Sequence, residues 1–356
     1  MANGGTWDAT SLPVRSGIYI NFRDAASESI TGGARGVVAI PILATSGTAE
    51  TGKFYTVTTE AEANELVGAD NAKAIIRALQ GGAREVLVYV VPANEQVAAR
   101  FTDLRDAYAL QDFNVFSYPS NVSEDQLTAT KAWVEECRNE GKHFIYVSGG
   151  NAAADADIAQ GNARSVLLKD EYIVNLVTGV IMPDGTELTS GDFASYIAGL
   201  IAGTPINEAI TYKEIPVTDV TKRLKSSEVT TALNSGSLVL IKDGNKVRVE
   251  QGVTTDSTAQ KRGKIRVTRG KQAVATDIPT AARDNYIGKI DNDSNGQATL
   301  IAAVKAYLET LEAERVLLNP EVILDPRYKS EGDSVFLAVS YTEIDSMERI
   351  FMTITA

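Results

Sequence analysis

The sequence is poor in the residues that build catalytic and metal sites. Its 356 residues include one cysteine, Cys137, and one histidine, His143. A single cysteine excludes an internal disulfide and a pair of thiols for a metal ion. Lysine and arginine number 34 against 46 aspartates and glutamates, for a formal net charge of −12. So acidic a surface repels phosphate backbones, and we expect no direct binding of nucleic acid.

Long apolar runs are also missing. No stretch of 18 apolar residues occurs, so we expect no stable insertion into a membrane. Residues 1–11 are polar and glycine-rich and lack the basic-then-apolar layout of a signal peptide, which predicts that the chain folds in a cytoplasm. Hydrophobic residues make up 44% of the chain, enough for two or three domains with cores of their own.

The first half of the chain alternates between strand and helix patterns. Predicted strands are 17–22, 36–43, 54–58, 85–91, 113–118 and 144–147, and predicted helices are 59–67, 71–80, 94–110 and 123–140. Ser123 opens the last of these helices with Gln126 three residues on, which is a capping box, and Gly141 closes it. Such alternation favours a parallel or mixed sheet covered by helices.

The second half is less regular, but it has its own signals. An apolar stripe predicts a helix over 192–202, and another predicts a helix from Gln297 to about Arg315. Asp243-Gly244-Asn245 between two apolar runs predicts a hairpin. Both ends of the chain alternate like half-buried strands, at 17–22 and 347–356, without an obvious hairpin partner beside either.

Two motifs resemble ligand loops and are incomplete. Gly47, Gly52 and Lys53 have P-loop spacing, but Phe54 stands where a magnesium-binding Ser or Thr belongs, and a strand pattern follows in place of a helix. We interpret this segment as a loop rich in Gly and Thr.

The second motif resembles the start of a calcium loop. Asp291, Asp293, Asn295 and Gly296 match its first half, but the twelfth position is Ala302, which has no carboxylate. We interpret the motif as a tight polar turn that caps the following helix, and we expect no metal ion there.

An enzymatic function would have to use His143 and the Gly149-Gly150-Asn151 turn. The turn follows a predicted strand, where an open α/β sheet binds ligands. No nucleophile signature such as G-x-S-x-G accompanies the histidine. We therefore identify no catalytic residues, although an α/β enzyme or ligand-binding protein with a site near His143 and Gly149-Gly150 remains an alternative.

Several segments resemble contractile phage tail sheath proteins of the Gram-positive type. The opening GGTWDATSLPVRSGIYINF (4–22) looks like the start of these proteins, although Arg15-Ser16-Gly17 stands where they usually have a proline before the glycine. Further similar segments are YIAGLIAGTPINEAITYKEI (196–215), VRVEQGVTT (247–255), YIGKIDNDSNG (286–296), AYLETL (306–311) and IDSMERIFMTITA (344–356). Their order and spacing are also similar, whereas residues 97–180 match poorly.

The resemblance implies an α/β and α+β fold: a multi-domain tail-sheath fold with a central α/β domain, an α+β C-terminal domain and extended N- and C-terminal β-strand arms. The implied divisions are an N-terminal arm (1–22), an N-terminal α/β part (23–95), a central variable α/β domain (96–185), a C-terminal α+β core facing the tube (186–343) and a C-terminal strand arm (344–356).

The resemblance to tail sheath proteins also implies a structural protein without cofactors. Copies of this chain would form hexameric rings in a helical sheath, with a tail tube protein, baseplate proteins and terminator proteins as further partners. The particle would be assembled in a bacterial host cytoplasm and then belong to a virion tail or an extracellular phage-tail-like particle, such as a bacteriocin. Another self-assembling tube or shell protein remains a further alternative.

The implied inter-subunit residues are those of the two strand-like ends and of the linker behind the first. For strand exchange they are Trp7, Ile18, Tyr19, Ile20, Phe22, Met347, Ile350, Phe351, Met352 and Ile354; for coupling through the linker they are Asp24, Ala25 and Ala26. A lone edge strand is a liability in a monomer but an adhesive in a polymer.

Overall fold

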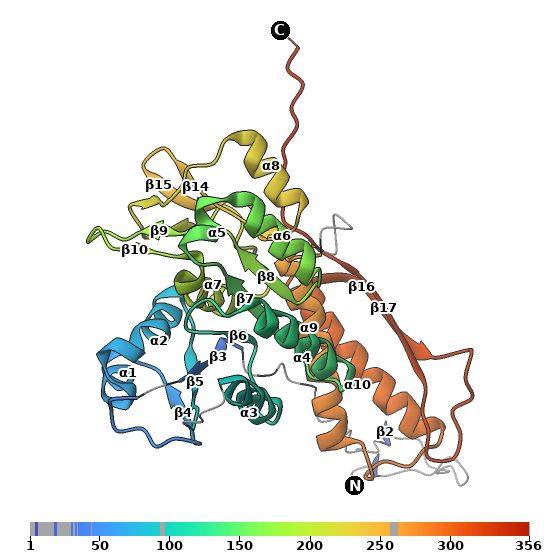
Figure 1. Ribbon diagram of the computed structural model, residues 1–356. Coiled ribbons are helices and arrows are strands. Elements are labelled where there is room, and N and C mark those ends of the chain that lie inside the picture. Colours follow the sequence, from blue (N-terminus) through green and yellow to red (C-terminus); the bar gives the residue numbers. More distant parts are fainter. Residues whose placement is uncertain are drawn as a thin grey trace.

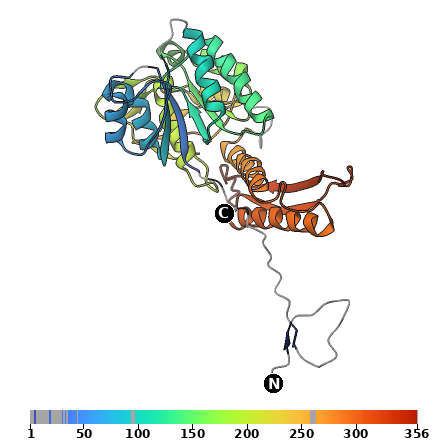
Figure 2. The same cartoon turned by 90° about the horizontal axis from the view of Figure 1, so that it is seen from below.

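A computed structural model shows two packed units and two terminal segments (Figure 1). The structure describes residues 4–5, 18–19, 30, 33, 35–43, 45–92, 97–256 and 263–355. The large unit is built on a seven-stranded sheet, and the smaller C-terminal unit is built on two long helices and a hairpin (Figure 2).

The large sheet has the strand order β13-β8-β7-β6-β3-β5-β4. Its strands are β3 (Val37–Ile42), β4 (Phe54–Val57), β5 (Glu85–Val90), β6 (Val115–Ser117), β7 (Ile145–Gly149), β8 (Ile173–Leu176) and β13 (Ser237–Leu238). The described pairings are parallel except for that of β4 with β5. These strands lie on both sides of the boundaries predicted at residues 96 and 186, so the sheet marks no division at either position.

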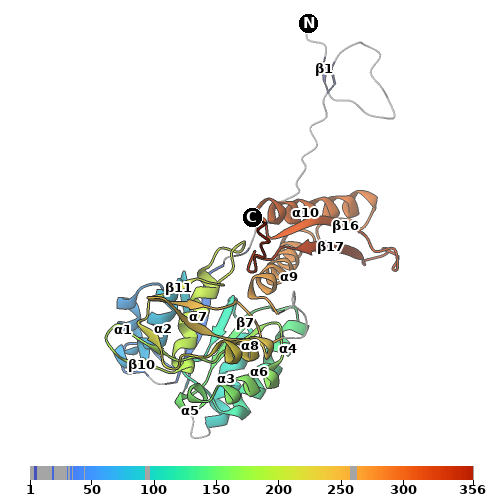
Figure 3. The ribbon, with the colours of Figure 1, turned by 90° about the horizontal axis from the view of Figure 1, so that it is seen from above.

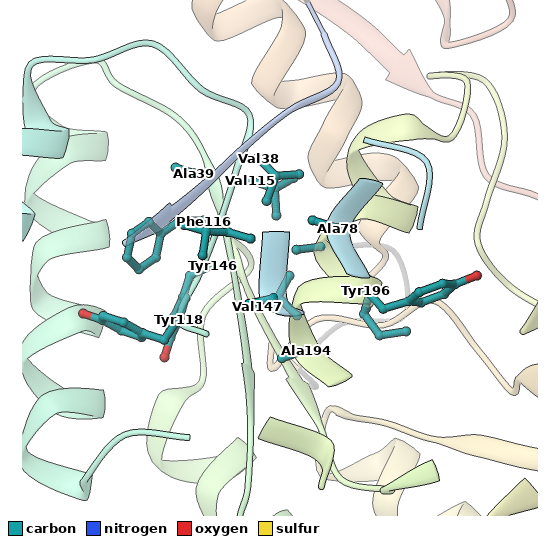
Figure 4. Close-up of a cluster of buried hydrophobic side chains, with 14 of the residues drawn as sticks. Val38, Ala39, Ala78, Val115, Phe116, Tyr118, Tyr146, Val147, Ala194 and Tyr196 are labelled. Carbon is teal, nitrogen blue, oxygen red and sulfur yellow. The ribbon is translucent and has the colours of Figure 1, made fainter. Parts of the chain in front are cut away.

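Helices cover both faces of this sheet. They are α1 (Glu60–Val67), α2 (Ala69–Gly81), α3 (Val97–Ala109), α4 (Glu124–Asn139), α5 (Ala152–Ala156), α6 (Ile158–Leu168), α7 (Ser190–Gly203) and α8 (Ser226–Asn234). Phe116 and Tyr118 point toward the face covered by α3 and α4, while Ala78, Ala194 and Tyr196 come from α2 and α7 on the opposite face (Figure 4). This is the α/β arrangement that the alternation predicted.

Helices α2 and α7 approach each other unusually closely. A Cβ added to Gly199 of α7 would lie 2.0 Å from the carbonyl oxygen of Ala78 in α2. Twelve of the fourteen residues of α7 are buried, because the helix lies between α2 and the sheet. The close contact therefore depends on a residue without a side chain at this point.

Two small sheets extend the large unit. One contains β9 (Val180–Ile181), β10 (Glu187–Leu188) and β12 (Asp219–Val220); the other contains β11 (Glu214–Ile215), β14 (Leu240–Asp243) and β15 (Lys246–Val249). Strands β14 and β15 form the predicted hairpin, and Gly244 takes the positive φ of 57° that its turn requires.

The C-terminal unit has a hydrophobic core of its own. It consists of α9 (Ile265–Asn285), α10 (Ser294–Ala313), β16 (Leu317–Leu324) and β17 (Leu337–Glu343), and its core includes Tyr307, Leu308 and Leu311 of α10. The helix predicted from Gln297 corresponds to α10, whereas α9 and the β16–β17 hairpin were not predicted. Together with the large unit, this α+β unit confirms the predicted fold class.

Two residues that precede β3, Ile30 and Arg35, contact the C-terminal unit. Ile30 is buried in the core of the C-terminal unit. The guanidinium of Arg35 lies 2.9 Å from a carboxylate oxygen of Asp277 in α9. Tyr307 donates a hydrogen bond to the same carboxylate. The pKa of Tyr307 is raised, mainly by its burial and secondly by the neighbouring carboxylate of Asp277.

Candidate assembly site

The C-terminal segment carries a group of strongly exposed apolar side chains. Residues 344–355 follow β17 without a strand or helix, and Figure 1 shows the end of this segment running away from the body. The predicted strand-exchange residues here are exposed by 69–91%: Met347, Ile350, Phe351, Met352 and Ile354. Exposed apolar groups of this size mark an interaction surface.

The alternation of side chains predicted at 347–356 does not produce a buried and an exposed face in the isolated chain. Ile350 and Phe351 would face opposite sides of a strand, yet both are exposed, by 69% and 91%. An extended segment gains two distinct faces only when it pairs with other strands. The strand predicted at this end therefore stays a prediction about an assembled form.

The N-terminal arm is described only in part. β1 (Gly4–Gly5) and β2 (Ile18–Tyr19) pair in parallel and lie apart from both units (Figure 3). The other predicted arm and linker residues lie outside the described residues: Trp7, Ile20, Phe22, Asp24, Ala25 and Ala26.

The β16–β17 hairpin is a third feature of this site, and sequence patterns did not reveal it. Its two strands pair only with each other among the described residues, so each has an outer edge without a partner strand. Leu318, Ile323 and Val339 are 40–45% exposed on the hairpin. Pro320 and a register shift interrupt β16, which is why the segment did not read as a strand.

The alternative ligand site near Gly149 is filled by the chain itself. The backbone N–H of Gly150 donates to Ser190 Oγ at 2.7 Å, and Gly191 N donates to the carbonyl oxygen of Gly150 at 2.8 Å. A Cβ on Gly149 would lie 2.1 Å from the carbonyl oxygen of Ser190. The start of α7 therefore occupies the place at which an α/β sheet of this kind would hold a ligand.

His143 and Gly149 lie at opposite ends of β7. Six residues of extended chain separate them by roughly 20 Å at about 3.3 Å per residue. Burial, followed by the charge of Arg138, lowers the pKa of the half-buried His143. Burial raises the pKa of the Cys137 thiol to about 11, which disfavours the reactive thiolate at neutral pH. The two halves of the proposed enzymatic site do not meet.

The two incomplete ligand motifs have structural roles. Lys53 pairs with Glu50 at 2.7 Å, and β4 begins directly after it, so a strand follows this loop where a P-loop has a helix N-terminus. The Asp293 carboxylate accepts hydrogen bonds from the backbone N–H groups of Asn295 and Gly296, at 3.0 and 2.8 Å. Asp293 is the N-cap of α10, as the turn interpretation predicted.

Within the ranges given above, no group of three or more His, Cys, Asp or Glu side chains could hold a metal ion. None of the helices that the structure describes is both long and apolar enough to cross a membrane.

Comparison with protein families matches most of the chain to one family. The phage tail sheath protein central domain matches residues 94–255, and the phage tail sheath C-terminal domain matches residues 257–356. The tail sheath protein of Clostridium phage phiCD119 is 24% identical over 84% of this chain and 81% of its own length. The protein XkdK of the phage-like element PBSX of Bacillus subtilis is 23% identical over 99% of both chains.

Solved structures share the fold at low sequence identity. The sheath tail protein of Desulfitobacterium hafniense aligns with a TM-score of 0.71 and 17% identity, over 92% of this chain and 100% of its own. The helical sheath of the anti-feeding prophage in its contracted state aligns with a TM-score of 0.74 and 16% identity, over 96% and 99%.

The chain belongs to the phage tail sheath family. It is a structural subunit of a contractile tail sheath and not an enzyme. The resemblance noted in its two ends and its C-terminal half is thereby confirmed.

Proposed function

We propose that copies of this chain polymerise as stacked hexameric rings around a tail tube, and that contraction of this sheath drives the tube through a target cell envelope. A tail tube protein, baseplate proteins and terminator proteins are the further partners. The chain would assemble in a bacterial host cytoplasm and then belong to a virion tail or to an extracellular phage-tail-like particle.

Two features of the same chain support this proposal. The segment 344–355 exposes apolar side chains, and the β16–β17 hairpin has strand edges without a described partner. Met352 and Ile354 are 79% and 85% exposed, and β16 and β17 each have an outer edge without a described partner strand. An extended segment of one subunit that adds to the sheet of another buries both features at once. Head-to-tail pairing of this kind builds an open helix when the rotation does not close.

Both arms have a part in this proposal. The N-terminal strand around Ile18–Phe22 and the C-terminal strand around Ile350–Ile354 would keep neighbouring subunits connected while their bodies rotate and slide. The extended sheath would be a higher-energy packing that is kinetically trapped and is released from the baseplate end.

A charge in either arm tests the proposal. Met352→Asp or Ile20→Asp would place a carboxylate in the apolar face of a shared sheet at every joint, at a cost of several kcal/mol per joint. We expect soluble folded monomers by sedimentation and circular dichroism, and no tubes by electron microscopy. Normal sheaths from these variants would refute strand exchange.

Thr353→Asp is the matched control. It adds the same charge one position away, on the opposite face of the predicted strand. We expect this variant to assemble more fully than Met352→Asp. Closed shells formed by the unaltered chain, in place of hollow helical tubes, would instead favour another kind of self-assembling protein.

A further inference from the structure

One side chain at the root of the exposed C-terminal segment turns inward. The Glu348 side chain is 8% exposed, while its neighbours Met347 and Arg349 are exposed. Its carboxylate accepts hydrogen bonds from Thr211 Oγ1 at 2.6 Å and from Gln251 Nε2 at 2.7 Å, and it forms an ion pair with Lys264. A buried carboxylate is thus matched with three donors.

The three donors come from different parts of the chain. Thr211 follows α7, Gln251 follows β15, and Lys264 is the N-cap residue of α9. Thr211 and Gln251 belong to the large unit, and Lys264, where α9 of the C-terminal unit begins, forms a bridge with Val253 of the large unit. Glu348 lies beyond β17 of the C-terminal unit. The carboxylate therefore joins the end of the chain to the large unit and to the start of α9.

The charge of Glu348 is stabilised in this position. Burial alone would raise the pKa of the carboxyl group, but the hydrogen bonds from Lys264, Thr211 and Gln251 outweigh it and hold the pKa below its usual value. The Lys264 side chain is itself only 9% exposed. Removing either partner would leave the other charge buried without its counter-ion.

We propose that Glu348 is a positioning residue that anchors the C-terminal arm and sets where its free part begins. The free part is then 349–356, which reaches at most about 29 Å when fully extended. A second contact holds residues 345–348, which form the stem of the arm. Arg266 Nη1 donates to Ser346 Oγ at 3.1 Å. This inference rests on the proposed function for the arm's role as a donated strand, but the anchor itself is a property of a single chain.

Cleavage by trypsin after Arg349 reports on this anchor in the monomer. A protease needs several residues on both sides of the scissile bond in an accessible extended form, so an anchored stem at 345–348 protects this bond. The product is identified by mass through the loss of residues 350–356. Residue 348 adjoins the cleaved bond, so its substitution also changes the intrinsic rate of cleavage. A protection factor corrects for this effect. It is the cleavage rate of a free peptide of the same sequence, 344–356, divided by the cleavage rate of the protein.

We expect Glu348→Gln to lower this protection factor at least ten-fold, with little change in cleavage elsewhere. Asp345→Asn is the matched control, since it removes an exposed charge from the same stem and should leave protection unchanged. The exchanged pair Lys264→Glu with Glu348→Lys should restore part of the protection, measured as the summed cleavage after residues 348 and 349 against a free peptide with the same exchange. Equal protection factors for the unaltered chain and Glu348→Gln would overturn the inference.

Assembly gives a second and separable readout. We expect Glu348→Gln to form fewer and shorter tubes, and the exchanged pair to recover part of their length. If Met352→Asp abolishes assembly while Glu348→Gln changes neither protection nor tube length, the anchor is refuted and strand exchange stands. If Met352→Asp assembles normally while Glu348→Gln loses protection, the anchor stands and strand exchange fails.

Discussion

Helix α7 and the C-terminal segment are both rich in apolar residues, and the fold treats them in opposite ways. In α7, twelve of fourteen residues are buried, including Ile197, which is fully covered. In the segment 344–355, Ile350 and Met352 are 69% and 79% exposed. The helix finds its partners in α2 and the sheet of its own chain, whereas the exposed apolar side chains of the segment are not covered by any residue that the structure describes.

This contrast separates residues that fold the subunit from residues that connect it to others. Substitutions in α7 should act on the free energy of unfolding of one chain, because they remove contacts within it. Substitutions in the segment should act on assembly and leave the unfolding of the monomer almost unchanged.

Ile197→Ala should have the largest effect. It removes a fully buried side chain between α2 and the sheet, and such changes lower the free energy of unfolding by about 2–5 kcal/mol. Chemical denaturation of the monomer measures the change. Met352→Ala is the control and should alter this free energy by less than about 0.5 kcal/mol. Equal effects of the two substitutions would remove the distinction.

Asp293→Ala should have an intermediate effect. The carboxylate caps α10 by accepting from two backbone N–H groups, and loss of an N-cap lowers stability by about 1 kcal/mol. The measurement is again denaturation of the monomer. Because the carboxylate already has these partners, a chelator should leave the melting temperature of the unaltered chain where it is. A clear drop on chelation would reinstate a calcium site.

An insertion in the N-terminal linker should leave folding unchanged and still alter function. Two or three residues added after Ala25 give roughly 7–10 Å of extra reach between the arm strand and the body. Ile30 is buried in the core of the C-terminal unit and Arg35 is paired to Asp277, so the slack stays ahead of these contacts. We expect sheaths that assemble but do not propagate contraction.

Electron microscopy of sheath length before and after acid or urea treatment tests this insertion. Normal shortening would show that the linker does not transmit the motion. Failure to assemble would mean that the linker residues Asp24–Ala26 belong to the arm strand itself.

Much of the large unit follows from local patterns. The apolar runs at 36–43 and 85–91 became β3 and β5, and the capped segment after Ser123 became α4. In each of these elements the signal and its cause lie within a few residues, since strand faces and helix caps are local properties. The apolar alternation at 350–354 was likewise visible in the sequence, and the strand that it predicts stays a prediction about an assembled form.

Helix α9 shows what the sequence alone did not determine. Its buried face includes Arg269, Gln272 and Asp277, and it contains Pro279, so no apolar stripe marks it. Arg269 donates to the carbonyl oxygen of Pro205, 64 positions away, and Arg35, which pairs with Asp277, is 242 positions away.

Composition, apolar periodicity and capping residues thus decided the class of fold and most elements of the large unit, and they predict strand pairing at the two ends. Only the tertiary structure decided the course of α9, the closing of the site near Gly149 by α7, and the inward turn of Glu348. In each case a polar or small residue is buried against partners that are distant in the chain. Burying such groups is favourable only when those partners are in place, and a local pattern contains no information about them.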